Sequence, residues 1–153
     1  MTFLSNAAGQ PVPVRVLIAE DETLIALSLS DLLEDDGFEV TLASDGAEAL
    51  AEARRLGSSL GALLTDLNMP YMSGEVLIHA LHIEQPELPV VVLTGSAPFG
   101  GLEELRRQSG GHGPLNLLHK PIDCAMLLST LRKATASARL RPPLTTALKT
   151  SSK

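Results

Sequence analysis

The chain has 153 residues, enough for one domain of ordinary size. Hydrophobic residues make up 44% of it and charged residues 20%, a composition typical of a globular protein that excludes a disordered chain. No apolar run approaches the ~18 residues that a membrane-spanning helix requires, and the first residues lack the pattern of a secretory signal. The only cysteine, Cys124, excludes an internal disulfide framework. We therefore expect a cytoplasmic protein with no membrane partner.

The formal net charge of −6 is unevenly distributed along the chain. All 18 acidic residues and six of the 12 basic residues precede residue 132, so residues 1–131 carry −12 and residues 132–153 carry +6. Nucleic-acid binding depends mainly on Lys and Arg, so the acidic body argues against a nucleic-acid partner. We expect a flexible N-terminal segment (1–13), one folded domain (14–138) and a basic, disordered tail (139–153).

Short apolar runs alternate along the chain with segments of helical periodicity. The expected elements are, in order, strand 14–19, helix 23–36, strand 38–42, helix 47–56, strand 62–65, helix 73–83, strand 90–93, a short helix within 98–108, strand 115–118 and helix 123–138. Gly37 is suited to end the first helix, and either Ser44 or Asp45 to cap the second. Such alternation predicts an α/β fold, a parallel sheet covered on both faces by helices.

Two helical segments contain residues that could be read as ligands or nucleophiles. His79 and His82 lie one helical turn apart, but no third ligand accompanies them, so we expect solvated side chains. Cys124 falls on the apolar stripe of the last helix, and we expect a buried small side chain.

Polar residues follow four of the five expected strands. They are Glu20 and Asp21 after the first, Asp66 after the third, Thr94 after the fourth and Lys120 after the fifth. Because ligands of open parallel sheets bind beyond the carboxyl ends of the strands, we expect these side chains to meet at one edge.

The chemistry of this set can be read from its charges. Three crowded carboxylates repel unless one is protonated or a cation lies among them, and Mg²⁺ prefers oxygen ligands. A carboxylate such as Asp66 can also act as a nucleophile and form an acyl phosphate. Lys120 would offset charge on the incoming phosphoryl oxygens, and Thr94 could donate a hydrogen bond to one of them.

The same residues carry a resemblance to a known family. Residues 16–22 (VLIAEDE), 43–50 (ASDGAEAL), 66–74 (DLNMPYMSG), 91–95 (VVLTG) and 119–121 (HKP) follow one another in the order of its motifs. Residues 66–74 are similar to the family's phosphorylation loop, D-x-x-M-P-x-M-x-G. Over about residues 14–135 the chain resembles the receiver domains of response regulators in two-component signalling.

This resemblance implies a doubly wound, flavodoxin-like sheet of five parallel strands in order 2-1-3-4-5, flanked by five helices. It implies that Asp66 accepts a phosphoryl group from a histidine kinase or a histidine phosphotransfer protein, with Mg²⁺ as cofactor. The implied metal ligands, direct or through water, are Glu20, Asp21, Asp66 and the backbone carbonyl of Asn68. Thr94 and Lys120 would bind the phosphoryl group.

The implied protein is a signalling switch and not an enzyme in the ordinary sense, since it catalyses only its own phosphorylation and dephosphorylation. Phosphorylation would alter the binding of a downstream protein partner, which the sequence does not identify. A homodimer is compatible with this reading. The 15–20 residues after the last helix are too few for a DNA-binding output domain, and whether the chain is a single-domain protein or a fragment stays open.

Two features depart from the family pattern. Three residues before the lysine, where the family commonly has Tyr or Phe, stands Leu117. The chain between residues 95 and 119 is rich in glycine and longer than usual, so we expect a fourth helix that is short, displaced or mobile. We therefore expect the output signal to pass mainly through residues 95–113.

Two other functions share features with this chain. A degenerate receiver would be a phosphorylation-independent interaction module; Leu117 keeps this alternative open, although the strand-end residues are intact. A phosphatase with an aspartyl nucleophile normally has a second Asp two residues after it, where this chain has Asn68, which cannot transfer a proton in that way.

Overall fold

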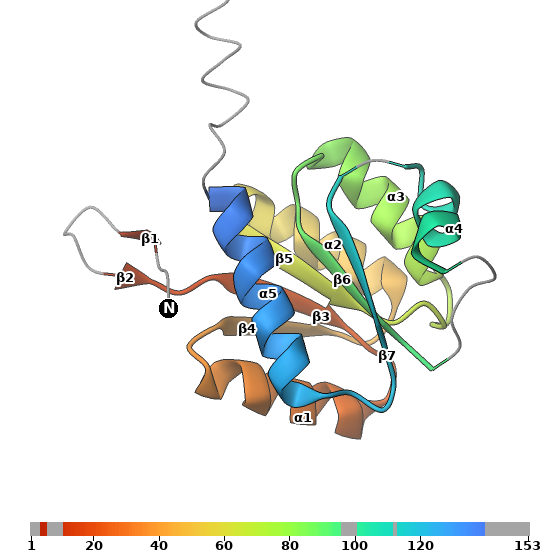
Figure 1. Ribbon diagram of the computed structural model, residues 1–153. Coiled ribbons are helices and arrows are strands. Elements are labelled where there is room, and N and C mark those ends of the chain that lie inside the picture. The colour runs from red at the N-terminus through yellow and green to blue at the C-terminus, as the bar shows by residue number, and fades with distance from the viewer. Residues whose placement is uncertain (1–3, 6–10, 96–100, 112, 140–153) are drawn as a thin grey trace, which may run out of the picture.

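The computed structural model describes residues 4–5, 11–95, 101–111 and 113–139 (Figure 1). Its centre is a parallel sheet of five strands in the order β4-β3-β5-β6-β7, which confirms the predicted 2-1-3-4-5 arrangement. The strands are β3 (Arg15–Ala19), β4 (Glu39–Ala43), β5 (Leu60–Thr65), β6 (Val90–Thr94) and β7 (Leu115–His119).

Helices cover both faces of this sheet (Figure 1). They are α1 (Thr23–Asp35), α2 (Gly46–Leu56), α3 (Gly74–Glu84), α4 (Gly101–Gln108) and α5 (Cys124–Arg139), with a short 3₁₀ turn, η1 (Gly57–Ser59), before β5. Helices α1 and α5 pack on one face, and α2, α3 and α4 pack on the other. As predicted, α4 is short.

The core is divided in two by the sheet. Alternate strand residues point to opposite faces, so Leu17 contacts the α2–α3 side while Val16 and Ile18 contact the α1–α5 side. Because both faces are covered, the central strands β5 and β6 are buried almost throughout, as the short continuous apolar runs of the sequence indicated.

Local signals account for how the helices begin and end. Gly37 has φ 96° and its N–H donates to the carbonyl of Glu34 at 3.0 Å, which ends α1 as predicted. The carboxylate of Asp45 accepts from the N–H of Glu48 at 2.8 Å, so Asp45 and not Ser44 caps α2.

Three expectations need correction. The N-terminal segment contains two short antiparallel strands, β1 (Leu4–Ser5) and β2 (Pro11–Val12), which the sequence analysis did not predict. His82 is buried and not solvated, and Cys124 is exposed and not buried.

Helix α5 ends at Arg139, the first residue of the expected tail, and residues 140–153 lie outside the described part of the chain. Among the helices described, none is long and apolar enough to cross a membrane.

Two leucines of α1 offer a matched test of this packing. Leu33 is fully buried, whereas Leu24 is 80% exposed. We expect Leu33→Ala to lower the free energy of unfolding by about 2–5 kcal/mol, because it removes buried apolar area and leaves a cavity. Leu24→Ala should change it by less than about 0.5 kcal/mol. Urea denaturation of both variants measures the difference, and equal losses would contradict the assignment of the buried face of α1.

Candidate functional site

The backbone brings four of the predicted strand ends to one edge of the sheet. The N–H of Asp66 donates to the carbonyl of Ala19 at 3.1 Å, and the N–H of Lys120 donates to the carbonyl of Thr94 at 2.8 Å. The strand ladders therefore continue one residue beyond the ends of β5 and β7. This continuation fixes the direction in which each polar side chain leaves the sheet.

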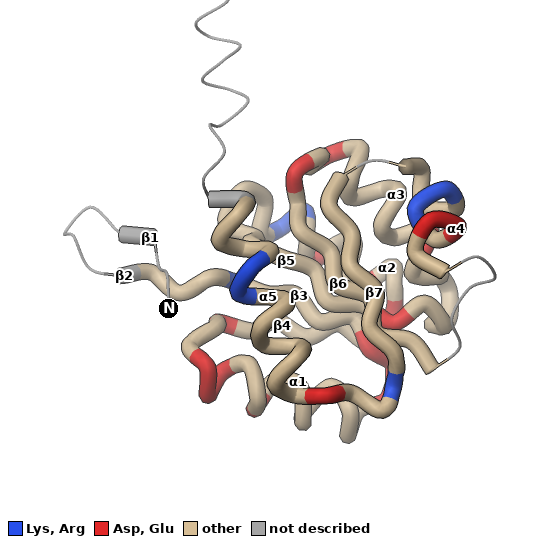
Figure 2. Tube along the Cα trace, viewed as in Figure 1, with Lys and Arg blue, Asp and Glu red and all other residues tan. Residues whose placement is uncertain are grey.

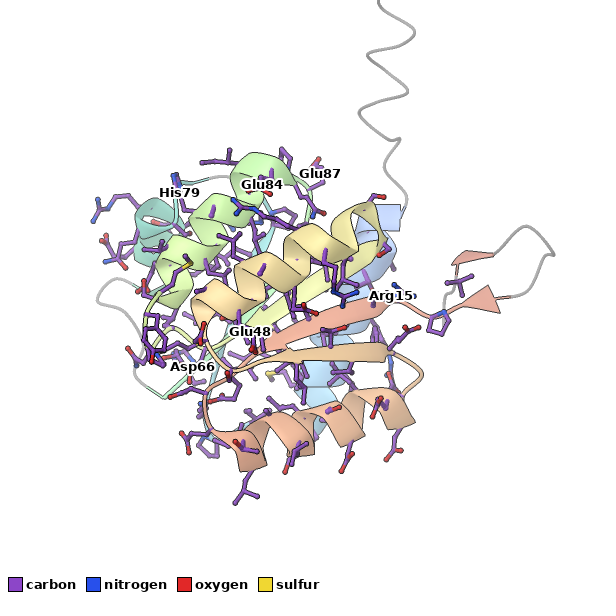
Figure 3. The ribbon with its side chains drawn as sticks, turned by 180° about the vertical axis from the view of Figure 1, so that it is seen from behind. Arg15, Glu48, Asp66, His79, Glu84 and Glu87 are labelled. Atoms are coloured by element: carbon purple, nitrogen blue, oxygen red, sulfur yellow. The ribbon has the colours of Figure 1, made fainter. Side chains whose placement is uncertain are left out.

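Three carboxylates form a cluster at this edge. Glu20, Asp21 and Asp66 each place one carboxylate oxygen within 4.8 Å of the other two. Glu20 is 3% exposed and Asp66 is 8% exposed, whereas Asp21 faces solvent. Figure 3 shows Asp66 at the carboxyl end of the strands, where the connections to the helices begin. An all-oxygen donor set of this kind suits a hard divalent cation such as Mg²⁺.

Lys120 supplies the positive charge within the cluster. Its Nζ lies 2.9 Å from Oδ2 of Asp66 and 3.3 Å from Oε1 of Glu20. Figure 2 shows acidic positions, in red, gathered at the edge of the sheet where β7 leads into α5. One ammonium group thus bridges two buried carboxylates that come from separate strands.

Burial and pairing act in opposite directions on the pKa values of this cluster. Burial raises the pKa of Glu20, and the N–H of Glu22, which donates to its Oε2 at 3.0 Å, opposes that rise only in part. Burial lowers the pKa of Lys120, but its hydrogen bond to Asp66 and the charge of Glu20 outweigh this effect, so the pKa is raised. Lys120 is consequently held in its charged form.

The loop that follows Asp66 is fixed by backbone contacts. The N–H of Asn68 donates to Oδ1 of Asp66 at 3.2 Å, and the N–H of Gly74 donates to the carbonyl of Leu67 at 2.9 Å. A Cβ at Gly74 would lie 2.4 Å from the carbonyl oxygen of Asp66, so only glycine permits this approach. Asn68 is exposed beside the carboxylate cluster.

The remaining predicted residues lie on the two strands beyond β5. Thr94 ends β6, is fully buried, and pairs in register with His119 of β7. Leu117 lies within β7, pairs with Val92 and is partly buried against the core on the α2–α3 side. The structure therefore groups Glu20, Asp21, Asp66 and Lys120, with Thr94 at the next strand end and Leu117 inside the sheet.

Comparison with known proteins identifies the family of this site. The sequence model of the response regulator receiver domain matches residues 16–132, most of the described chain. The chain belongs to the response-regulator receiver family. Receivers are phosphoacceptor switches of two-component signalling, and that is the class of function of this domain.

Two curated relatives show how far the likeness extends. A response regulator receiver protein of Anaeromyxobacter sp. (strain Fw109-5) is 39% identical over 114 residues, which cover 74% of this chain and 45% of the relative. The transcriptional regulatory protein PdtaR of Mycobacterium tuberculosis is 33% identical over 141 residues, covering 91% of this chain and 65% of that protein. The receiver thus spans between about half and two thirds of the length of these relatives.

Solved structures agree with the fold. A receiver domain protein from Clostridium thermocellum has a TM-score of 0.75 at 26% identity, covering 83% of this receiver and 98% of that chain. The chemotaxis protein CheY4 of Vibrio cholerae has a TM-score of 0.70 at 29% identity, covering 80% and 99%.

The raised pKa of Glu20 predicts a pH dependence of stability. Ionisation of the Glu20 carboxyl disfavours the folded state. The contribution of the neutral carboxyl to the free energy of unfolding is therefore fully present below its ordinary pKa of 4.5, and it is lost as the pH rises through the raised pKa of the folded state. In the presence of a chelator, the free energy of unfolding of the wild type relative to Glu20→Gln should therefore fall between acid and neutral pH. Urea denaturation across this range measures the trend.

Glu52 provides a control of opposite sign. Its hydrogen bond with Arg55 lowers its pKa, so its contribution is present above the ordinary carboxyl pKa and is lost as the pH falls. The stability of the wild type relative to Glu52→Gln should rise slightly with pH. Trends of the same sign in both variants would show that the burial of Glu20 does not govern its ionisation.

Proposed function

We propose that Asp66 is the phosphoacceptor of this receiver and that Glu20, Asp21, Thr94 and Lys120 serve the transfer. The observation that carries the proposal is the position of the Asp66 carboxylate. It is buried, lies within 4.8 Å of two further carboxylates, and has the Lys120 ammonium 2.9 Å away. A nucleophile placed in this way meets both the charge and the positioning requirements of phosphoryl transfer.

The proposed ligands of Mg²⁺ are oxygens of Glu20, Asp21 and Asp66 together with the backbone carbonyl of Asn68. Bound there, the ion supplies positive charge that offsets the charge of the phosphoryl oxygens. The buried position of Glu20 and the exposed position of Asp21 give them different access to such an ion, directly or through water.

The transfer itself follows from the contacts of Asp66. One carboxylate oxygen attacks the phosphorus of a phosphohistidine, a P–O bond forms and the P–N bond breaks. The electron pair of that bond stays on the imidazole nitrogen, which takes up a proton from solvent. Asp66 then carries a mixed acyl phosphate, and later attack by water on the phosphorus returns the carboxylate and releases phosphate.

Lys120 and Thr94 are proposed to bind the phosphoryl group once it is in place. The Lys120 ammonium already contacts Asp66 and is held in its charged form, so it can pair with a phosphoryl oxygen after a small movement. The hydroxyl of Thr94 can donate a hydrogen bond to another phosphoryl oxygen from the end of the neighbouring strand.

The proposed donors are a histidine kinase or a histidine phosphotransfer protein, and the proposed output is altered binding to a downstream protein in the cytoplasm. The degenerate alternative has no support in the site, because each residue needed for transfer is present. A phosphatase would need an acid or base at Asn68, whose amide cannot serve in that role.

Asp66 can be tested by chemical phosphorylation. Incubation with acetyl phosphate and Mg²⁺ should add the mass of one phosphoryl group to the wild type, because the activated donor needs no partner protein. Asp66→Asn should lose the labelling, since an amide is not a comparable nucleophile. Asp21→Ala should retain Asp66 but require more Mg²⁺, because one carboxylate ligand is lost. Intact-protein mass spectrometry gives the readout, and undiminished labelling of the Asn variant would place the acceptor elsewhere.

The route of the output signal can be tested by hydrogen exchange. Leu117 has no aromatic ring to rotate and is already partly buried, whereas residues 95–113 contain glycines that lower the cost of rearrangement. On binding of beryllofluoride with Mg²⁺, we expect the largest change in protection in residues 95–113 and little change in β7. A dominant change in β7 would instead indicate a switch that works through Leu117, and Asp66→Asn serves as the inactive control.

A further inference from the structure

Tyr71 has an unusual conformation in the loop that carries Asp66. Its φ is 68°, and it is the only non-glycine residue with a positive φ in the described part of the chain. The N–H of Met72 donates to the carbonyl of Pro70 at 2.7 Å, which closes a three-residue ring around Tyr71. A bond of this span around a residue with positive φ is typical of the classic γ-turn, which is rare and strained. For a bulky aromatic residue this conformation is a true outlier.

Backbone contacts on the side of α2 hold the turn in place. A Cβ at Gly46, the first residue of α2, would lie 2.4 Å from the carbonyl oxygen of Met72 and 2.7 Å from its Cβ. The residue after Tyr71 is therefore packed directly on the start of α2. The 2.9 Å bond from Gly74 to Leu67 closes the loop on its other side. The backbone at Tyr71 is thus held by contacts on both sides of it in the chain.

The ring of Tyr71 contributes little to the folded chain itself. The residue is 90% exposed, the most exposed large hydrophobic residue among those described. An exposed aromatic held in a strained backbone offers no burial to offset the strain. Strained backbone conformations of this kind are concentrated at functional sites. The ring is consequently available to a molecule outside the chain.

The position of this ring relates it to phosphoryl transfer. Tyr71 belongs to the connection from β5 to α3, five residues after Asp66. Since Asp66 is 8% exposed, a protein donor must pass its imidazole over the surrounding rim to reach the carboxylate. A small donor can enter without touching the rim. Contact with Tyr71 would therefore distinguish the two kinds of donor.

Other exposed apolar side chains lie on the same rim. Leu24, Val76 and Met126 are each exposed in the first turn of a helix, and these helices are the ones that follow β3, β5 and β7 in the chain. Figure 1 shows that α1 and α5 both start at the carboxyl edge of the sheet. The rim thus combines an acidic pocket with scattered apolar contacts, a surface that suits a protein more than a free anion.

We propose that Tyr71 is a specificity-determining residue for phosphoryl transfer, an aromatic anchor for the docking of a protein that carries phosphohistidine. The inference rests on the proposed role of Asp66. Aromatic residues dominate the binding energy of many protein interfaces, and a backbone already fixed before contact loses little conformational entropy on binding. The turn restricts the backbone from which the ring projects.

The experiment compares two donors that share a P–N bond. One is phosphoramidate, and the other is a phosphorylated histidine phosphotransfer protein selected for transfer to the wild type. Tyr71→Asn removes the ring while tolerating the left-handed backbone, and Tyr71→Phe retains the ring. We expect Tyr71→Asn to lower kcat/KM with the protein donor at least about tenfold, mainly through KM, as for the loss of an interface anchor.

With phosphoramidate, the rates of both Tyr71 variants should stay within about twofold of the wild type, because the pocket itself is unchanged. Tyr71→Phe and Ile83→Ala, an exposed apolar control at the other end of α3, should keep the wild-type rate with the protein donor. Equal losses with both donors, or no loss with the protein donor, would overturn the inference. Urea denaturation should show Tyr71→Asn to be at least as stable as the wild type, and a less stable variant would contradict the strained turn.

Asp66→Asn separates failure of this inference from failure of the proposed function. If Asp66 is the acceptor, this variant loses labelling from both donors while its Tyr71 remains in place. Persistent labelling of Asp66→Asn would reject the assignment of the acceptor. Labelling confined to Asp66, with a protein-donor rate unaffected by Tyr71→Asn, would reject only the docking role of Tyr71.

Discussion

Electrostatic repulsion among the carboxylates of Glu20, Asp21 and Asp66 is the constraint that governs the arrangement of charges at the carboxyl ends of the strands. Two of these carboxylates are buried, so solvent screens them poorly, and the Lys120 ammonium offsets their charge. Removing that ammonium would leave two buried charges without compensation, which is far more costly than the loss of a surface ion pair. The hydrogen bond from Lys120 to the carbonyl of Thr94 ties this cation to the sheet.

Much of the fold and the site could be predicted because strand ends are visible in the sequence. Short apolar runs end at or just before Glu20, Asp66, Thr94 and Lys120, so they indicate both where each strand ends and which polar residue stands there. Parallel pairing then brings these residues to one edge without further information. The contacts of Lys120 with two separate carboxylates, in contrast, depend on side-chain positions that no sequence pattern specifies.

The wrong predictions for the burial of His82 and Cys124 have physical explanations. His82 lies one turn after Ile78 on the buried face of α3, and its Nε2 is 2.9 Å from the carbonyl of Leu88, so a polar side chain is accommodated in the core. Cys124 follows the helical period of Leu127, but it lies in the first turn of α5, where it stays exposed. Helical periodicity indicates on which side of a helix a residue lies. It does not indicate how far along the helix the packed sheet extends.

No pattern in the sequence predicts the backbone conformation of Tyr71 or the strands β1 and β2, for a different reason. The γ-turn at Tyr71 is accompanied by packing of Met72 on Gly46, a contact between segments about 26 residues apart that no local propensity encodes. The pairing of β1 with β2 involves two residues on each strand, too few for a periodic signal.

The contact between His82 and Gly113 has a mechanical consequence for α4. A Cβ at Gly113 would lie 2.6 Å from Nε2 of His82 and 2.5 Å from the carbonyl oxygen of Pro86, so the turn after α4 rests directly on α3 and its following loop. Arg106 of α4 also donates to the carbonyl of Gly113 at 2.9 Å. Because Arg106 ties this turn to α4, moving α4 away from α3 would break either that bond or the packing of Gly113 on His82. The C-terminal end of α4 is therefore held against α3 beside His82, and the buried side chain of Leu105 holds the middle of the helix in the core.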